Sequence, residues 1–280
     1  MFTCVKKFYY RGLREYRFLS DISRGGMSRV YRVSSKLTGE ILAVKILFPA
    51  YAARRNHVEK IFQEKQVEGD IAISLSHPNI IRTYSSGRFK DRYYFAMEYI
   101  KGPNIRQAIY KQPFLLKNRK SEIILQIAEG LSYLHSKGII HRDICSKNVL
   151  LSPDGGAKII DFGLSVLKRG NYRAEGERSG TPSYMAPEQI RGEEFDERTD
   201  IYSLGVTMYE ILAERTPFAG SDNYSKMQNH LNHVPALLSR HVPGISKELA
   251  MIAGKAMEKN PDDRYPSAYS LILDLKSAMK

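Results

Sequence analysis

The pattern of hydrophobic residues changes at residues 101–104, and this change restricts the possible folds more than any other feature of the sequence. Before it, runs rich in β-branched and aromatic residues alternate with turns, as in ILAVKILF (41–48) and RYYFAMEYI (92–100). After it, apolar residues recur at helical spacing, as in residues 118–138 and 199–215. The sequence therefore predicts an α+β fold in which a small β-rich half precedes a larger helical half.

Two segments of the second half are typical of helices. One face of the first carries Ile123, Ile124, Ile127, Leu131 and Leu134, with Gly138 placed to end the helix. The second, residues 199–215, is apolar on nearly all sides, which indicates a buried helix. In the first half, residues 57–76 also have helical spacing, and Gly69 within them lowers helix stability by about 1 kcal/mol relative to alanine.

Composition limits the class of protein. The 280 residues are 42% hydrophobic and 26% charged, which suits one large domain or two lobes. No apolar run approaches the roughly 20 residues that span a bilayer, and the basic, aromatic start lacks the apolar segment of a signal peptide. Because Cys4 and Cys145 have neither disulfide nor zinc spacing, we expect a reducing, cytoplasmic compartment.

The formal net charge of +13 favours anionic partners, and a solvated basic surface with no partner is the alternative. Most of the positive charges are spread along the chain, which argues against a nucleic acid partner. The densest cluster is Lys6, Lys7, Arg11, Arg14 and Arg17. We therefore expect residues 1–15 to be a basic N-terminal extension that binds an anionic surface or partner. An added strand or a flexible arm is the alternative.

The stretch SRGGMSRV (23–30) lies between two predicted strands. Paired glycines in a strand–turn–strand unit let the backbone approach a phosphate closely, but they also make an ordinary hairpin turn. These eight residues alone leave both interpretations open.

Four further motifs follow in order along the chain: AVK (43–45), HRDICSKN (141–148), DFG (161–163) and APE (186–188). Each is weak alone, but in this order and at these separations they resemble eukaryotic-type (Hanks-type) serine/threonine protein kinases. The resemblance covers about residues 16–280. GTPSYMAPEQI is similar to the serine/threonine branch, and GGMS, HPNI and YMAPEQ are most like its bacterial members.

The resemblance implies a two-lobed protein kinase fold, with a β-rich N-lobe carrying one helix (16–98), a hinge (98–104) and a mainly helical C-lobe (105–280). It also implies ATP and Mg²⁺ as cofactors and protein serine or threonine hydroxyls as substrates. Two alternatives stay open: a catalytically weak nucleotide-binding pseudokinase scaffold, and a kinase of small molecules. The GTPSYMAPE segment disfavours the second, because protein kinases use it to position a peptide.

The catalytic residues are carried over from the family by motif. Lys45 is expected to hold the α- and β-phosphates as a point charge, with Glu68 as its carboxylate partner. Glu64, one helical turn away, is the alternative for Glu68. Asp143 is expected to orient the substrate hydroxyl and accept its proton.

The nucleotide and metal sites are also implied by the resemblance. Asn148 and Asp161 are expected to bind Mg²⁺, which prefers oxygen ligands. Met97 is expected to control the back of the adenine pocket, with the Glu98 carbonyl and the Ile100 amide at the adenine edge. The full set of expected nucleotide contacts is Ile22, Ser23, Gly25, Gly26, Val30, Ala43, Lys45, Met97, Glu98, Ile100 and Leu150.

The sequence departs from the family pattern at two places. Ser23 and Ser28 replace glycines of the phosphate loop, so only Gly25 of its three marked glycines remains. Cys145 stands where serine/threonine kinases carry a lysine two residues after the catalytic aspartate. Lys147 is expected to supply that charge instead. Cys145 is either a reactive thiol or, as we expect, a small partly buried side chain.

Other matched residues have architectural or regulatory roles in the family. Glu188 and Arg264 are expected to form a buried ion pair, and Asp200 to hydrogen-bond the backbone near Arg142. Between DFG and APE, Glu177, or else Glu175, is expected to face Arg142 as a built-in negative charge in place of a phosphate. The alternatives are a solvent-exposed glutamate, or a phosphorylation switch at Ser165, Tyr172 or Ser179.

Overall fold

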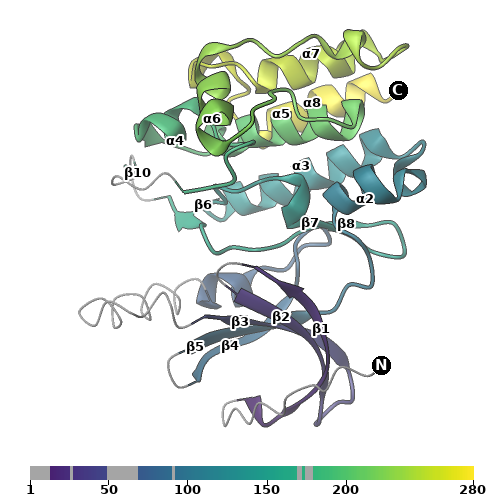
Figure 1. Ribbon diagram of the computed structural model, residues 1–280, viewed down its shortest axis with the longest axis vertical. Helices are drawn as coiled ribbons and strands as arrows, with labels where there is room; N and C mark the ends of the chain where they lie inside the picture. The colour runs from purple at the N-terminus through teal and green to yellow at the C-terminus, as the bar shows by residue number, and fades with distance from the viewer. Residues whose placement is uncertain (1–12, 26–27, 49–68, 90–91, 169–171, 174–178) are drawn as a thin grey trace. The chain divides into compact units, whose positions relative to one another are not determined.

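The structure is a computed structural model that describes residues 13–25, 28–48, 69–89, 92–168, 172–173 and 179–280. The chain divides into two compact units, residues 1–77 with 81–101 and residues 78–80 with 102–280. Figure 1 shows that the first unit is built on a β-sheet and that the second is mainly helical. The predicted α+β class, with the β-rich part first, is confirmed.

The first unit contains a five-stranded antiparallel sheet with the strand order β1-β2-β3-β5-β4 (Figure 1). Its strands are β1 Tyr16–Arg24, β2 Ser28–Ser35, β3 Ile41–Leu47, β4 Thr83–Phe89 and β5 Arg92–Glu98. The stretch 23–30 therefore joins β1 to β2, the two strands predicted on either side of it, and the Gly25 amide donates to the Ser28 carbonyl at 2.9 Å. Gly39 has a φ of +77° in the next turn, a conformation that glycine adopts without steric cost.

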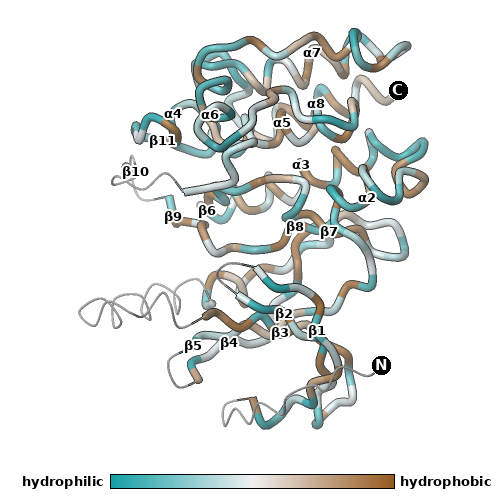
Figure 2. The backbone as a smooth tube through the Cα atoms, in the orientation of Figure 1, coloured by the Kyte–Doolittle hydropathy of each residue, from teal (hydrophilic) through white to brown (hydrophobic). Residues whose placement is uncertain are grey.

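One face of this sheet carries the hydrophobic core of the unit. Its buried residues are Leu13, Tyr16, Val33, Leu42, Val44, Ile46, Phe89, Tyr94 and Ala96, and Figure 2 shows how hydrophobic positions fall along the strands. Because side chains alternate along a strand, Ala43 and Lys45 lie on the opposite face from Leu42 and Val44. The predicted nucleotide-binding residues of β3 are thus on the other face, which carries a smaller buried cluster of Tyr93 and Phe95 with Leu47 and Met97 packed against it.

Only part of the helix predicted at 57–76 falls among the described residues. Residues 69–74 are helical, and the preceding residues lie outside the described ranges. Gly69, which the sequence marks only as a weak point, has a packing reason, because a Cβ there would overlap the side chain of Ser86 on β4.

The second unit is built around α3 Lys120–Ser136 and α5 Arg198–Ala213. The five apolar residues predicted for one face of α3 are all fully buried, and Gly138 follows its end with a φ of +69°. In α5 every residue except the first and the last is buried. Both helix predictions are confirmed. Within the described ranges, no helix is both long enough and apolar enough to cross a membrane.

The other helices of this unit are α2 Ile105–Lys111, α4 Pro187–Arg191, α6 Asn223–Asn232, α7 Lys247–Ala256 and α8 Ala268–Ala278, with 3₁₀ turns η3 Pro113–Leu116, η4 Ser146–Asn148, η5 Leu238–Arg240 and η6 Pro261–Asp263. Short antiparallel pairs join its loops: β6 Ile139–Ile140 with β9 Val166–Leu167, β7 Val149–Leu151 with β8 Ala157–Ile159, and β10 Tyr172–Arg173 with β11 Glu194–Phe195. The β7–β8 hairpin brings the HRDICSKN and DFG segments together.

The predicted ion pair between Glu188 and Arg264 is present. Arg264 Nη1 and Nη2 donate to the two carboxylate oxygens of Glu188 at 2.7 and 2.8 Å, and both side chains are almost completely buried. Arg264 also donates to the carbonyl oxygens of Glu258, Lys259 and Arg198. Both buried charges are therefore hydrogen-bonded as well as paired, which is the condition under which a buried ion pair is tolerated.

Candidate active site

The HRDICSKN segment is a loop between β6 and β7 whose first residues are held by the fully buried carboxylate of Asp200 on α5. Asp200 Oδ2 accepts from the His141 amide at 2.8 Å, and Oδ1 accepts from the Arg142 amide at 2.7 Å. This confirms the predicted role of Asp200. Burial by itself raises the pKa of Asp200, but the contact with His135, 3.0 Å away, and the backbone bonds outweigh it and lower the pKa.

The far end of the loop is held by a second carboxylate of α5. Ser146 Oγ lies 2.9 Å from the hydroxyl of Tyr184, which donates to Glu210 Oε2 at 2.5 Å. All three residues are buried. Burial, followed by the Glu210 charge, raises the pKa of Tyr184, so the phenol stays protonated and acts as the donor. The loop is thus fixed at both ends to one buried helix.

Asp143 lies between these two attachment points with both carboxylate oxygens in hydrogen bonds. Oδ1 accepts from the backbone amide of Thr181 at 2.8 Å, and Oδ2 accepts from Asn148 Nδ2 at 2.8 Å. The side chain is only partly buried. The carboxylate is therefore held in one orientation while it stays accessible to a substrate, as a general base requires.

Asn148 and Asp161 are suited to a hard cation. Asn148 Nδ2 donates to both the carbonyl and the carboxylate of Asp143, so the amide oxygen is the end of Asn148 that these bonds leave for a ligand. The Ile160 amide donates to the Asn148 carbonyl at 2.9 Å, which joins the two segments. Asp161 is exposed, and its φ of +68° is a strained conformation of the kind found at functional sites.

Mg²⁺ usually takes one or two protein side chains and completes its shell with water and phosphate oxygens. In the part of the chain that the structure describes, no group of three or more His, Cys, Asp or Glu residues could hold a metal ion without such help. The amide and carboxylate oxygens of Asn148 and Asp161 fit Mg²⁺ of this phosphate-assisted kind.

Arg142 connects the loop to the segment that precedes α4. Arg142 Nη2 donates to Ser179 Oγ at 2.6 Å, its guanidinium lies 5.1 Å from the centre of the Phe195 ring, and Gln189 Nε2 donates to the Arg142 carbonyl at 3.1 Å. Glu175 and Glu177 lie outside the described residues, so the built-in-charge hypothesis stays a prediction. The Ser179 alternative rests on a residue that Arg142 contacts directly.

The position where the family carries lysine is closed to solvent. Cys145 is fully buried, and its Sγ lies 3.8 Å from Thr181 Oγ1. Burial raises the pKa of the Cys145 thiol to about 12, which keeps it protonated and unreactive. The structure thus supports the expected buried side chain over a reactive thiol. Lys147, in the turn η4, is exposed.

The predicted residues of the first unit share one face of the sheet. Directly paired residues on antiparallel strands have side chains on the same side. Val30 pairs with Lys45, Lys45 pairs with Phe95, and Ala43 pairs with Met97. The structure therefore brings Val30, Ala43, Lys45 and Met97 together.

The remaining nucleotide residues are placed as follows. Ile22 and Ser23 lie at the end of β1 and Gly25 just beyond it, all exposed, whereas Gly26 and Glu68 lie outside the described residues. Glu98 ends β5, where its carboxylate accepts from the Arg82 amide at 2.8 Å and its own amide donates to the Arg82 carbonyl at 2.9 Å. Ile100 is half-buried in the connector, and Leu150 lies on β7 of the second unit.

The sequence prediction missed the contacts that orient the loop. These are the Thr181 amide on Asp143, the buried Tyr184–Glu210 pair and the Gln189 bond to the Arg142 carbonyl. No periodicity marks them, because the partners come from separate elements. The only signal was that Thr181, Tyr184 and Gln189 all lie in the GTPSYMAPEQI motif.

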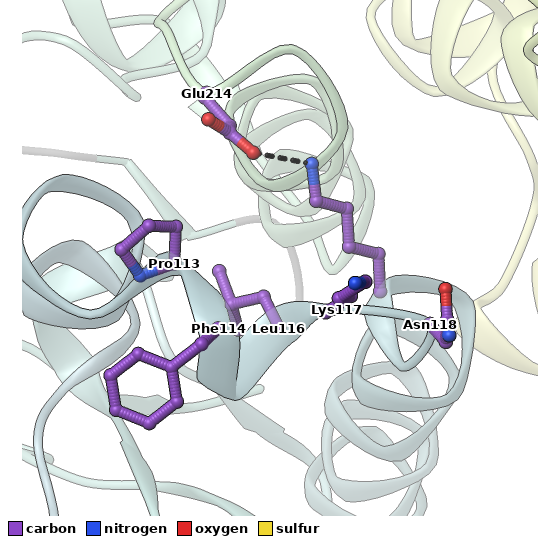
Figure 3. A pocket seen from close by; sticks show the side chains of 7 residues that line it. Pro113, Phe114, Leu116, Lys117, Asn118 and Glu214 are labelled. Carbon is purple, nitrogen blue, oxygen red and sulfur yellow. Dashed lines mark hydrogen bonds and ion pairs between the residues drawn. The ribbon is translucent and has the colours of Figure 1, made fainter.

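A surface pocket of about 390 Å³ lies apart from these residues in the second unit (Figure 3). It is lined by Pro113, Phe114, Leu116, Lys117, Asn118, Lys120 and Glu214, and Lys120 Nζ binds Glu214 Oε1 at 2.9 Å. None of the predicted site residues lines it.

The chain is similar in sequence to protein kinases along most of its length. Residues 16–273 match the family described as the protein kinase domain. The chain is 35% identical over 265 residues to a probable serine/threonine-protein kinase of Streptomyces coelicolor, covering 92% of this chain and 39% of that protein. It is 33% identical to serine/threonine-protein kinase PknB of Mycolicibacterium smegmatis, covering 90% of this chain and 41% of that protein. It is 32% identical to serine/threonine-protein kinase PrkC of Bacillus subtilis, covering 94% and 40%. The chain thus spans about two fifths of the length of these relatives.

Proposed function

This chain belongs to the protein kinase domain family, among relatives that are bacterial serine/threonine kinases, and we propose that it transfers the γ-phosphoryl group of ATP to serine and threonine hydroxyls of proteins. The observation that carries the proposal is the Asp143 carboxylate, held by Thr181 and Asn148 on a loop that two buried carboxylates fix to α5. No observation favours the pseudokinase alternative.

Asp143 is the proposed catalytic base. The substrate hydroxyl donates to a carboxylate oxygen of Asp143, which turns the hydroxyl oxygen toward the γ-phosphorus and accepts its proton as the new P–O bond forms. The bond between the γ-phosphorus and the bridging oxygen breaks, and ADP leaves. The Thr181 amide keeps Asp143 oriented, and the segment that carries Thr181 is the one that positions the peptide.

Asn148 and Asp161 are the proposed Mg²⁺ ligands. When bound, Mg²⁺ neutralises charge on the phosphate oxygens of ATP. The hydrogen bonds from Asn148 Nδ2 to Asp143 keep the amide oxygen of Asn148 oriented for this role.

The face of the first unit's sheet that carries Val30, Ala43, Lys45 and Met97 is the proposed nucleotide face. Lys45 holds the α- and β-phosphates, with Glu68 as its carboxylate partner, and the apolar side chains contact the base. The β1–β2 connection lies over the phosphates and binds them through backbone amides. The other proposed nucleotide contacts are Ile22, Ser23, Gly25, Gly26, Glu98, Ile100 and Leu150.

The direct test is transfer of radiolabelled γ-phosphate from ATP, with Mg²⁺, to three peptides that differ only in a serine, threonine or tyrosine acceptor. We expect labelling of the serine and threonine peptides and not of the tyrosine peptide. The same reaction with EDTA should give no transfer, because the metal is removed. Folded protein that labels none of the peptides, nor a generic basic protein, would refute the kinase activity.

We expect Lys45→Met to lower kcat/KM by at least about 10²-fold, or roughly 2.7 kcal/mol, because phosphate positioning is lost. The substitution should leave the melting temperature nearly unchanged, since the larger hydrophobic cluster lies on the other face of the sheet and an apolar methionine suits the smaller cluster of Tyr93 and Phe95 beside Lys45. Steady-state kinetics with the peptide substrate measure the effect. The exposed Lys117, replaced in the same way, is the control and should keep the parent rate. Parent-like transfer by folded Lys45→Met would show that this lysine has been misassigned.

We propose that Lys147 supplies the charge that the family places at Cys145. Lys147→Ala should lower kcat by about 10-fold or more while ATP binding weakens less, because the ammonium interacts most with the transferring phosphoryl group. Lys147→Arg keeps the charge and should keep most of the rate. Adding Cys145→Lys to Lys147→Ala should restore activity in part, provided that the buried site accepts the longer side chain. An unchanged rate in Lys147→Ala would rule out this role.

We also propose that the basic extension, residues 1–15, binds an anionic surface or partner and that the protein lies in the cytoplasm. Residues 1–12 lie outside the described residues, and of the five clustered basic residues the structure describes Arg14 and Arg17, both exposed. Location in the cytoplasm rests on the cysteine spacing alone.

A further inference from the structure

The outer face of α7 carries an exposed methionine beside an open helical glycine. Met251 is 73% exposed. A Cβ built on Gly254 would meet no atom within 4 Å. Both residues line a groove of about 440 Å³, whose lining also includes Val234 and Leu237.

Among the described residues, no atom packs against the space that a Cβ on Gly254 would fill. The other helical glycines in the described ranges are each required by packing, because a Cβ on Gly69, Gly130 or Gly205 would come within 3.0 Å of Ser86, Asn79 or Ala256 respectively. A glycine inside a helix lowers stability relative to alanine. Its presence at an open position leaves room for another molecule to approach the helix backbone closely.

Three apolar residues of the groove lining are strongly exposed to solvent. Val234 is 86% exposed and Leu237 is 67% exposed, and both lie with Met251 around the same depression. Isolated exposed hydrophobic residues are normal on protein surfaces, but a contiguous group around a groove is typical of an interaction surface.

The face of α7 that carries Met251 and Gly254 has a positive charge at one end and a negative charge at the other. Lys247, Met251, Gly254 and Glu258 are spaced by four, three and four residues, which places them along one face as the chain leaves α7. Lys247 and Glu258 are both exposed. The order along the face is therefore positive charge, projecting side chain, empty position and negative charge.

When two such faces meet with their helices antiparallel, each positive charge faces a negative charge and each projecting side chain faces an empty position. We propose that the face binds the same face of a second copy of the chain, with the two α7 helices antiparallel about a two-fold axis between residues 252 and 253. Met251 then lies over Gly254 of the partner subunit, and Lys247 faces Glu258 of the partner subunit. Each contact occurs twice, and the flanking Val234 and Leu237 cover the centre.

An acidic peptide from another protein fits the groove less well. The two lysines that line it are already engaged within the chain: Lys255 Nζ lies 4.4 Å from the centre of the Tyr265 ring, and Lys259 Nζ donates to the His230 carbonyl at 2.6 Å. Such a peptide would also leave Glu258 facing negative charge. A second copy gives Glu258 an opposite charge.

Sedimentation velocity of the whole chain over about 10⁻⁶ to 10⁻³ M tests for the dimer. A surface of one helix and a loop is small, so we expect a weak, concentration-dependent dimer with a Kd of roughly 10⁻⁴ M. A protein that stays monomeric over this whole range would overturn the proposal, and binding of an acidic peptide to that monomer would assign the groove to another partner.

Charge exchange tests the register. Lys247→Glu and Glu258→Lys each turn two attractive pairs into repulsive ones, so each should raise the dimer Kd by about tenfold or more. The double variant restores both pairs and should return the Kd to near the parent value. Lys111→Glu, at an exposed lysine of α2, makes the same charge change elsewhere and should leave the Kd unchanged. Failure of the double variant to recover dimerisation would refute the antiparallel register.

Gly254→Leu tests the apolar centre. Because the position is open, the variant should fold with an unchanged or slightly higher melting temperature. The leucine occupies the space that Met251 of the partner subunit needs, so the dimer should be lost at every concentration. A folded Gly254→Leu variant that dimerises as the parent does would refute this contact.

Discussion

Asp143→Asn is expected to lower kcat by about 10³-fold, which corresponds to roughly 4 kcal/mol of transition-state stabilisation. The variant loses the proton acceptor. It also disturbs the site, because both oxygens of Asp143 accept hydrogen bonds, from the Thr181 amide and from Asn148 Nδ2. An asparagine presents an NH₂ group to one of these donors, so one bond is lost and the side chain no longer has a single favoured orientation.

The measurement separates chemistry from binding and from folding. Peptide phosphorylation kinetics give kcat, nucleotide titration gives ATP affinity, and thermal unfolding reports the fold. ATP affinity and melting temperature should change little, since Asp143 is only partly buried and is not a proposed nucleotide contact. A folded Asp143→Asn variant that transfers phosphate at the parent rate would exclude Asp143 as the base.

Arg264→Met is expected to lower the free energy of unfolding by about 3–5 kcal/mol, because it leaves the buried carboxylate of Glu188 without its partner. The three carbonyl oxygens that Arg264 binds also lose a donor. For a chain of this size, such a loss corresponds to a fall in melting temperature of about 10 °C. Urea unfolding monitored by circular dichroism measures it, provided that unfolding is reversible and two-state.

The matched control is the exposed ion pair between Lys276 and Glu129, whose side chains are 52% and 34% exposed. Lys276→Met should cost no more than about 1 kcal/mol, since solvent screens surface pairs. Replacing Glu188 and Arg264 together by apolar residues should cost less than Arg264→Met alone, because no unpaired charge is left. Equal, small effects of Arg264→Met and Lys276→Met would contradict the structural role of the buried pair.

The structural features that could be predicted best from the sequence are those that depend on the residues of a single helix or strand. The buried faces of α3 and α5 follow from spacing alone, because a helix repeats every 3.6 residues and burial selects apolar side chains. The strands of the first unit follow from their β-branched and aromatic residues. Glu188 with Arg264, and Asp200 with the Arg142 backbone, were reached through the resemblance to protein kinases, since no spacing rule joins residues so far apart.

The contacts that complete the candidate site could not be predicted in this way. The Thr181 bond to Asp143 comes from a backbone amide, which every residue except proline offers, so the side-chain pattern carries no signal for it. Cys145 looked like a missing charge, and only its burial against Thr181 shows how the chain uses that position. From the sequence, Gly69 only lowers helix stability, and the structure adds that a larger side chain there would overlap Ser86.

The attachment of the HRDICSKN loop at both ends to α5 has a consequence for local opening. Asp200 holds the loop at His141 and Arg142, and Glu210, through Tyr184, holds it at Ser146. Since α5 is buried along almost its whole length, we expect the His141 and Arg142 amides to exchange with solvent slowly, through opening of the helical core. Control of activity is therefore expected to act through the segments around the proposed base Asp143, rather than through the two attachment points of the loop.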